Sequence, residues 1–178
     1  MTRAVILALA AFVGVSPSAE AAPTWFFKGR CEDSRVKRGS LSEDLTIQAG
    51  ERINCDIAIL TKFKNGRVLM QFHTGTGVLG FAGPFLNETT DDTTYLPIDK
   101  IYPVRDLGLS ADEILKNSAS GEGVIVDGVD GICTLNGSNF KHVRKIKCIA
   151  KHEIAQHKSV YSVTIDVSRV TRHELPGL

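Results

Sequence analysis

The amino-acid sequence predicts a mainly β fold, an antiparallel small barrel or a sandwich, with one short helix and two disulfides. Three observations support this prediction. Several segments alternate between apolar and polar residues with a period of two, which is typical of half-buried strands. The pair Asn65-Gly66, a strong hairpin signal, separates two such segments. The chain also has four cysteines, an even number that suits disulfide pairing in an exported protein.

The N-terminus has the three parts of a secretory signal peptide. A basic start precedes an apolar run from Ala4 to Val15, and small residues precede the expected cleavage after Ala21 or Ala22. The run is shorter than the roughly 20 residues that span a bilayer, and no later segment is apolar enough to do so. We therefore expect residues 1–21 to be a signal peptide and residues 22–178 to form a single periplasmic or secreted β-rich domain.

The charge composition argues against a nucleic-acid-binding protein. The sequence has 21 Lys and Arg residues against 20 Asp and Glu residues, which gives a formal net charge of +1. Proteins that bind nucleic acids usually carry a clear basic excess. We therefore expect no nucleic-acid partner.

The mature chain begins with a predicted strand over Trp25–Cys31, in which Trp25, Phe27 and Cys31 share one face. The charged stretch Glu32–Leu45 predicts a loop. The stretch Leu45–Glu51 predicts a short strand that ends in a turn at Ala49-Gly50.

A hairpin is expected between Ile53–Phe63 and Arg67–Phe72, because both segments alternate and Asn65-Gly66 suits a two-residue type I′ turn. Such a turn pairs Phe63 with Val68, Thr61 with Met70, and Ile59 with Phe72, so the apolar residues share one face.

The glycine-rich stretch that follows predicts a turn and a bent edge strand over Val78–Leu86, with Pro84 marking an edge or a bulge. It does not lead into a helix, which a phosphate-binding loop needs. A polar loop at 87–94 contains Asp91 and Asp92, but without the ligand spacing of a calcium loop. Another strand is expected at Tyr95–Val104.

The one predicted helix spans Ser110–Asn117, where Ser110 and Glu113 form a capping box. The strand signal resumes at Val124–Val126. Two Asp-Gly pairs, at 127–128 and 130–131, then predict turns.

The apolar pattern favours one of the three possible pairings of the cysteines. If Cys133 faces Cys148 in a strand pair, Leu135 faces Ile146 and the apolar residues share a side. This leaves Cys31 to pair with Cys55. A zinc site is not favoured, because no two cysteines have Cys-x-x-Cys spacing and the expected compartment is oxidising.

The last predicted strand, Val160–Val167, is expected to pair antiparallel with Val143–Ala150 across a loop at 151–159. The basic tail from Arg169 to Leu178 is expected to fray.

One motif hints at catalysis. His152, Glu153 and His157 resemble the zinc-peptidase motif HExxH with one residue too many. Histidines five residues apart do not share a helix face, and strands are expected on both sides, so a surface hairpin loop is favoured. There is no Gly-x-Ser-x-Gly nucleophile motif. Asp99 is the acid we would examine first for a raised pKa, although exposure to solvent is favoured.

The sequence therefore favours a non-catalytic binding or interaction module, with an unknown protein or small-molecule ligand and no cofactor. The alternatives are a metal-dependent hydrolase that uses His152, Glu153 and His157, and a structural envelope protein. Asn87 and Asn136 begin glycosylation sequons, which are used only where the host glycosylates exported chains.

Overall fold

The computed structural model describes residues 22–74, 77–86, 88–105 and 126–175. The predicted helix at Ser110–Asn117 and the predicted signal peptide lie outside these residues. The described part contains ten strands: β1 (Ala22–Ser40), β2 (Glu51–Arg52), β3 (Cys55–Lys62), β4 (Arg67–Thr74), β5 (Gly77–Pro84), β6 (Glu88–Thr90), β7 (Thr93–Arg105), β8 (Val126–Asn136), β9 (Lys145–Ile154) and β10 (His157–Leu175).

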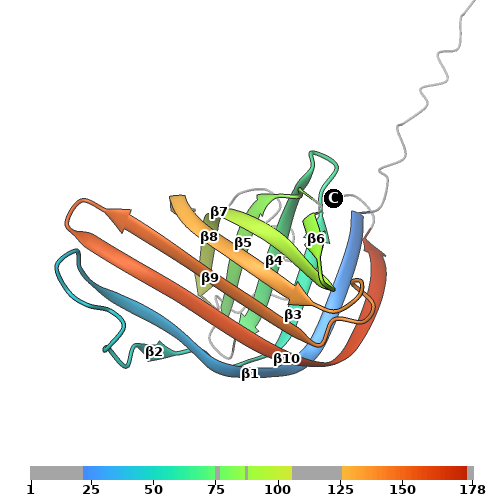
Figure 1. Cartoon of the computed structure of the whole chain (residues 1–178), viewed down its shortest axis with the longest axis horizontal. Coiled ribbons are helices and arrows are strands. Elements are labelled where there is room, and N and C mark those ends of the chain that lie inside the picture. The colour runs from blue at the N-terminus through green and yellow to red at the C-terminus, as the bar shows by residue number, and fades with distance from the viewer. Residues whose placement is uncertain (1–21, 75–76, 87, 106–125, 176–178) are drawn as a thin grey trace, which may run out of the picture.

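The fold is a closed antiparallel barrel (Figure 1). The eight long strands pair in the order β1, β3, β4, β5, β7, β8, β9 and β10, and β10 then pairs with β1. The two short strands are additions, β2 beside β1 and β6 beside β7. The prediction of a mainly β fold is confirmed, and of the two predicted architectures the structure has the barrel and not the sandwich.

Side chains fill the barrel. Eight strands enclose a space that side chains can occupy, and here large apolar groups from every wall strand point inward. Phe72 and Phe81 meet edge to face, with ring centroids 5.7 Å apart. The largest fully buried apolar side chains are Phe27, Leu60, Val68, Met70, Phe72, Phe81, Leu96, Ile101, Leu135, Ile146 and Ile165.

Aromatic side chains cover the end of the barrel where β1 begins. Phe140, in the loop between β8 and β9, packs between Trp25 and Phe85, with centroid distances of 4.8 and 6.3 Å. The Lys62 ammonium lies 4.0 Å from the centroid of the Phe85 ring. This contact adds a cation–π attraction to the apolar packing.

At the opposite end, β1, β9 and β10 continue beyond the barrel (Figure 1). β1 pairs with β10 from Ala22–Leu175 to Ser40–His157. The predicted loop at Glu32–Leu45 was therefore wrong as far as Ser40, and the predicted fraying of the tail was wrong from Arg169 to Leu175. Both segments contain many polar residues, but residues 32–40 pair with residues 157–164 of β10, and residues 169–175 pair with residues 22–28 of β1.

Two predictions for the segments that follow β1 and that connect β9 to β10 were also wrong. The residues 41–50, expected to contain a strand, form a loop in which Leu45 is buried. The expected loop at 151–159 is a tight turn at Ala155-Gln156, because β9 and β10 pair up to Ile154 and His157. Ala155 has a positive φ of 51°, which suits such a turn.

The central hairpin was predicted in the right place but in the wrong register. The Phe63 N–H donates to the Arg67 carbonyl at 2.9 Å, so the loop has three residues, and among them only Gly66 has positive φ. Leu60 consequently faces Met70. The apolar pattern did not reveal this shift because both faces of the hairpin are buried, including Ile59 and Leu69 on the outer face.

The prediction of an edge strand over Val78–Leu86 was also wrong, because β5 lies between β4 and β7 and is almost wholly buried. Its glycines permit close approach of the neighbouring strand. A Cβ at Gly83 would lie 1.8 Å from the Pro97 carbonyl oxygen. The Asp-Gly pairs at 127–128 and 130–131 do not end a strand but lie within β8, where Gly128, with a φ of 70°, belongs to a bulge opposite Asp99 of β7.

Both predicted disulfides are present, Cys31–Cys55 and Cys133–Cys148. In the β8–β9 ladder Cys133 faces Cys148 and Leu135 faces Ile146, as the apolar pattern predicted. Within the described part of the chain, no helix has the length and hydrophobicity of a membrane span.

Candidate functional site

The barrel wall opens between β1 and β3. The ladder that joins these strands ends at the pair Lys28–Ile57. β1 then pairs with β2 from Arg35–Arg52, and just before this point the Ile53 N–H donates to the Ser34 carbonyl at 2.8 Å. Between these two points no ladder pair joins the strands, and the Cys31–Cys55 disulfide crosses the gap.

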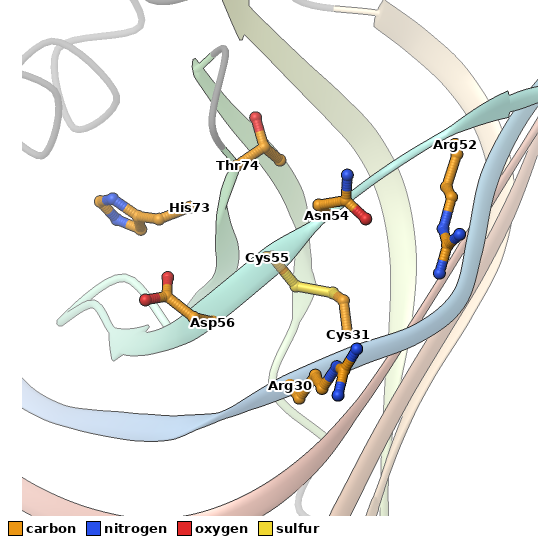
Figure 2. Close-up of a pocket in the computed structure, with 8 residues that line it drawn as sticks. All are labelled: Arg30, Cys31, Arg52, Asn54, Cys55, Asp56, His73 and Thr74. Carbon is orange, nitrogen blue, oxygen red and sulfur yellow. A yellow bond between two sulfur atoms is a disulfide. The ribbon is translucent and has the colours of Figure 1, made fainter.

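A cleft of about 440 Å³ lies at this gap, and we call it the arginine cleft (Figure 2). This volume is within the range of small-molecule sites. In Figure 2, Asp56 and His73 lie to one side of the disulfide and Arg52 lies to the other. The lining residues are Arg30, Cys31, Arg52, Asn54, Cys55, Asp56, His73 and Thr74.

The cleft carries positive charge that the described residues do not neutralise. The side chains of Arg30 and Arg52 form no ion pair and no hydrogen bond within the described residues. Arg67, in contrast, is paired with Asp99. Two guanidinium groups with free donors, together with the Asn54 amide, suit an anionic ligand because each presents N–H groups to oxygen atoms.

His73 stands at the wall of the cleft as a neutral imidazole. Burial lowers its pKa below the ordinary value of 6.5, because the charged ring loses its hydration, and the nearby Asp56 carboxylate partly opposes this effect. Its Nε2 atom is buried and has no hydrogen-bond partner among the described residues. At neutral pH the two arginines and Asp56 therefore leave the cleft with a net charge of about +1.

The sequence did not single out Arg30, Arg52, Asn54 or His73 as site residues. They come from three separate segments of the chain, and each of these residue types is common on protein surfaces. One indirect signal was present, because Cys31 and Cys55 are neighbours of Arg30 and Asn54 and their pairing was predicted. That pairing brings the two segments together.

The residues of the zinc-peptidase-like motif lie on a strand hairpin and not on a helix. His152 faces Ser159 and His157 faces Ile154 in the β9–β10 ladder. Since successive strand residues point to opposite faces, Glu153 projects from the face opposite His152. No group of three His, Cys, Asp or Glu side chains in the described ranges is arranged to hold a metal ion.

The other acidic residues that the sequence analysis considered lie outside the arginine cleft. Asp99 is half-exposed and accepts two hydrogen bonds from Arg67, one of them at 3.0 Å. Asp91 and Asp92 form the exposed turn between β6 and β7, and both have positive φ. All four cysteines are in disulfides, so none provides a thiolate.

Comparison of the chain with protein-family models, with curated proteins and with solved structures gives no match. The case for a function therefore depends on the geometry of the arginine cleft.

Proposed function

We propose that this protein is an exported, non-catalytic binding protein that holds a small anion in the arginine cleft. The observation that carries this proposal is that Arg30 and Arg52, neither of which is paired with another described residue, line one cleft of about 440 Å³. A carboxylate, phosphate or sulfate group would accept hydrogen bonds from both guanidinium groups.

The two disulfides are consistent with an oxidising compartment outside the cytoplasm. Because side chains fill the barrel interior, we propose a ligand site on the wall rather than in the lumen. The Cys31–Cys55 bridge holds both sides of the cleft at a fixed separation, and such preorganisation lowers the entropy that binding costs.

Calorimetric titration of the purified, disulfide-bonded protein tests the proposal. Inorganic phosphate, sulfate and succinate serve as anionic probes, and succinamide serves as the uncharged analogue of succinate. We expect saturable binding of at least one anion, no binding of succinamide, and an affinity that falls as salt is added because ions screen the arginines.

The double variant Arg30→Gln/Arg52→Gln locates the site. Each substitution should weaken binding about fivefold, which corresponds to about 1 kcal/mol for a partly exposed charge pair. Lys64→Gln/Lys141→Gln is the matched control, because it removes the same charge from exposed positions at the other end of the barrel. The proposal fails if none of the anions binds, or if both double variants lose the same affinity.

A further inference from the structure

A second groove lies on the outer face of the strands that continue beyond the barrel. Its wall is the β1–β2 loop, residues 41–50, which is hydrogen-bonded to β1 and β10. Its volume is about 540 Å³. We call it the loop groove, and its lining residues are Asp33, Arg35, Lys37, Leu45, Thr46, Gln48, Ala49, Ile149, Lys151, Val160 and Ser162.

Many hydrogen bonds hold the wall of the loop groove in place. From β1, Lys37 Nζ donates to the Thr46 carbonyl at 3.1 Å and Arg35 Nη1 donates to the Ala49 carbonyl at 2.8 Å. From β10, Lys158 Nζ donates to the Leu41 carbonyl at 2.9 Å. Inside the loop, the Leu45 side chain is 5% exposed. The groove is therefore formed before any ligand binds.

The floor of the loop groove combines apolar and cationic side chains. Ladder pairing places Lys151 beside Val160, and Val160 beside Lys37. In the next row Ile149 lies beside Ser162. On the other side of Ile149, β8 contributes Ile132, which is 41% exposed. The apolar floor thus continues as an exposed strip past the edge of the groove.

The three cations on the floor differ in the partners that they have among the described residues. Arg35 and Lys37 are committed to loop carbonyls, and Arg35 is also paired with Asp33 at 3.0 Å. The Lys151 side chain makes no hydrogen bond or ion pair with any residue of the described ranges. Among the described residues that line the groove, Lys151 is thus a cation with neither a hydrogen bond nor an ion pair, and it stands at the side of an apolar surface.

We infer that the loop groove binds an amphiphilic carboxylate, a free fatty acid or a molecule of the same chemistry. The carboxylate pairs with the Lys151 ammonium. The hydrocarbon chain lies on Ile149, Val160 and Leu45 and leaves along Ile132. This site is separate from the arginine cleft, which lies beside β3 and β4 and has a polar lining, so the two binding activities can be lost independently.

Titration of the ¹⁵N-labelled, disulfide-bonded protein with decanoate, monitored by amide chemical shifts, tests the inference. Decanoate should give saturable shifts at Leu45, Ala49, Ile149 and Val160. Decanol, which keeps the chain but has no charge, and butyrate, which keeps the charge but has a short chain, should each bind at least about threefold more weakly.

Single substitutions test the cationic part and the apolar part of the loop groove separately. Lys151→Gln should weaken decanoate binding about threefold, and Ile149→Ser should weaken it about fivefold because the chain loses apolar contact. Lys147→Gln is the matched control, because Lys147 is exposed on the same face of β9 but does not line the groove. Thermal unfolding of each variant confirms that the fold is retained.

Three results would overturn the inference. The first is an equal affinity for decanoate and decanol. The second is decanoate-induced shifts that appear at the arginine cleft and not at the loop groove. The third is binding to vesicles of phosphatidylglycerol without binding of free decanoate, which would assign the surface to a membrane and not to a single amphiphile.

Discussion

The two disulfides should contribute almost equally to stability but differ in their effect on the arginine cleft. They close segments with sequence separations of 24 for Cys31–Cys55 and 15 for Cys133–Cys148. In the chain-entropy model these separations correspond to about 3.4 and about 3.0 kcal/mol of stabilisation. Removing either bridge by a double Cys→Ala substitution should therefore lower the free energy of unfolding by about 3 kcal/mol.

The effect on ligand binding should not be equal. Cys133–Cys148 lies within an unbroken ladder, with Ile132–Ile149 paired on one side and Leu135–Ile146 further along. Removing it leaves those backbone hydrogen bonds in place. Cys31–Cys55 instead crosses a gap without ladder pairs, so Cys31→Ala/Cys55→Ala should release the two walls of the arginine cleft. Anion binding should fall at least tenfold in this variant and stay within about twofold in Cys133→Ala/Cys148→Ala.

Guanidinium unfolding measures the stability of both variants. The single tryptophan, Trp25, is buried against Phe140 and reports the loss of structure at the far end of the barrel. The corresponding fall in melting temperature should be about 6–12 °C, at about 2–4 °C per kcal/mol for a domain of this size. The calorimetric titration with anions then measures the cleft at a temperature where each variant is folded.

One outcome would refute this reasoning directly. If Cys31→Ala/Cys55→Ala bound anions with unchanged affinity, the flanking ladders alone would hold the cleft, and the bridge would have no positioning role. Equal losses of binding in the two variants would instead show that general loosening of the barrel, and not the local gap, controls the site.

Three further predictions concern the core, the close strand contact and the pH dependence. Phe72→Ala should cost about 3–5 kcal/mol in urea unfolding because it removes a fully buried ring that contacts Phe81, and a loss below about 1 kcal/mol would contradict the filled interior. Gly83→Ala should cost about 1–3 kcal/mol because its Cβ would meet the Pro97 carbonyl, whereas Gly66→Ala, with open space around it, should show only its backbone strain. The lowered pKa of His73 means that the unfolded chain binds more protons, so its stabilising contribution is full above pH 6.5 and is lost as the pH falls through the lowered value. His73→Gln should therefore reduce the loss of stability between pH 7 and pH 5, and an unchanged pH profile would argue against a buried neutral ring.

Local sequence patterns predicted the elements that depend on neighbouring residues alone. The alternation in Val160–Val167 correctly predicted a strand paired with residues 143–150, and the pattern around Cys133 and Cys148 correctly predicted the register of β8 and β9, since each of these strands has one buried face and the other turned outward. The same logic failed by one residue at the Asn65-Gly66 turn, because β3 and β4 are buried on both faces. A pattern of alternation carries no register information when neither face is solvated.

Pairing between segments distant in sequence determined the extent of β1 and β10, the closure of the barrel and the position of the arginine cleft. The polar residues after Cys31 and before Leu175 become strand because β1 and β10 pair with each other across almost the whole chain. The same closure turns the sheet into a barrel and opens the wall where β1 passes from β3 to β2. The sequence by itself determined a β-rich, doubly bridged chain, but only the tertiary structure brought Arg30, Arg52 and His73 to one cleft. Residues so distant in sequence become neighbours only when strand pairing is complete, and no local propensity records that proximity.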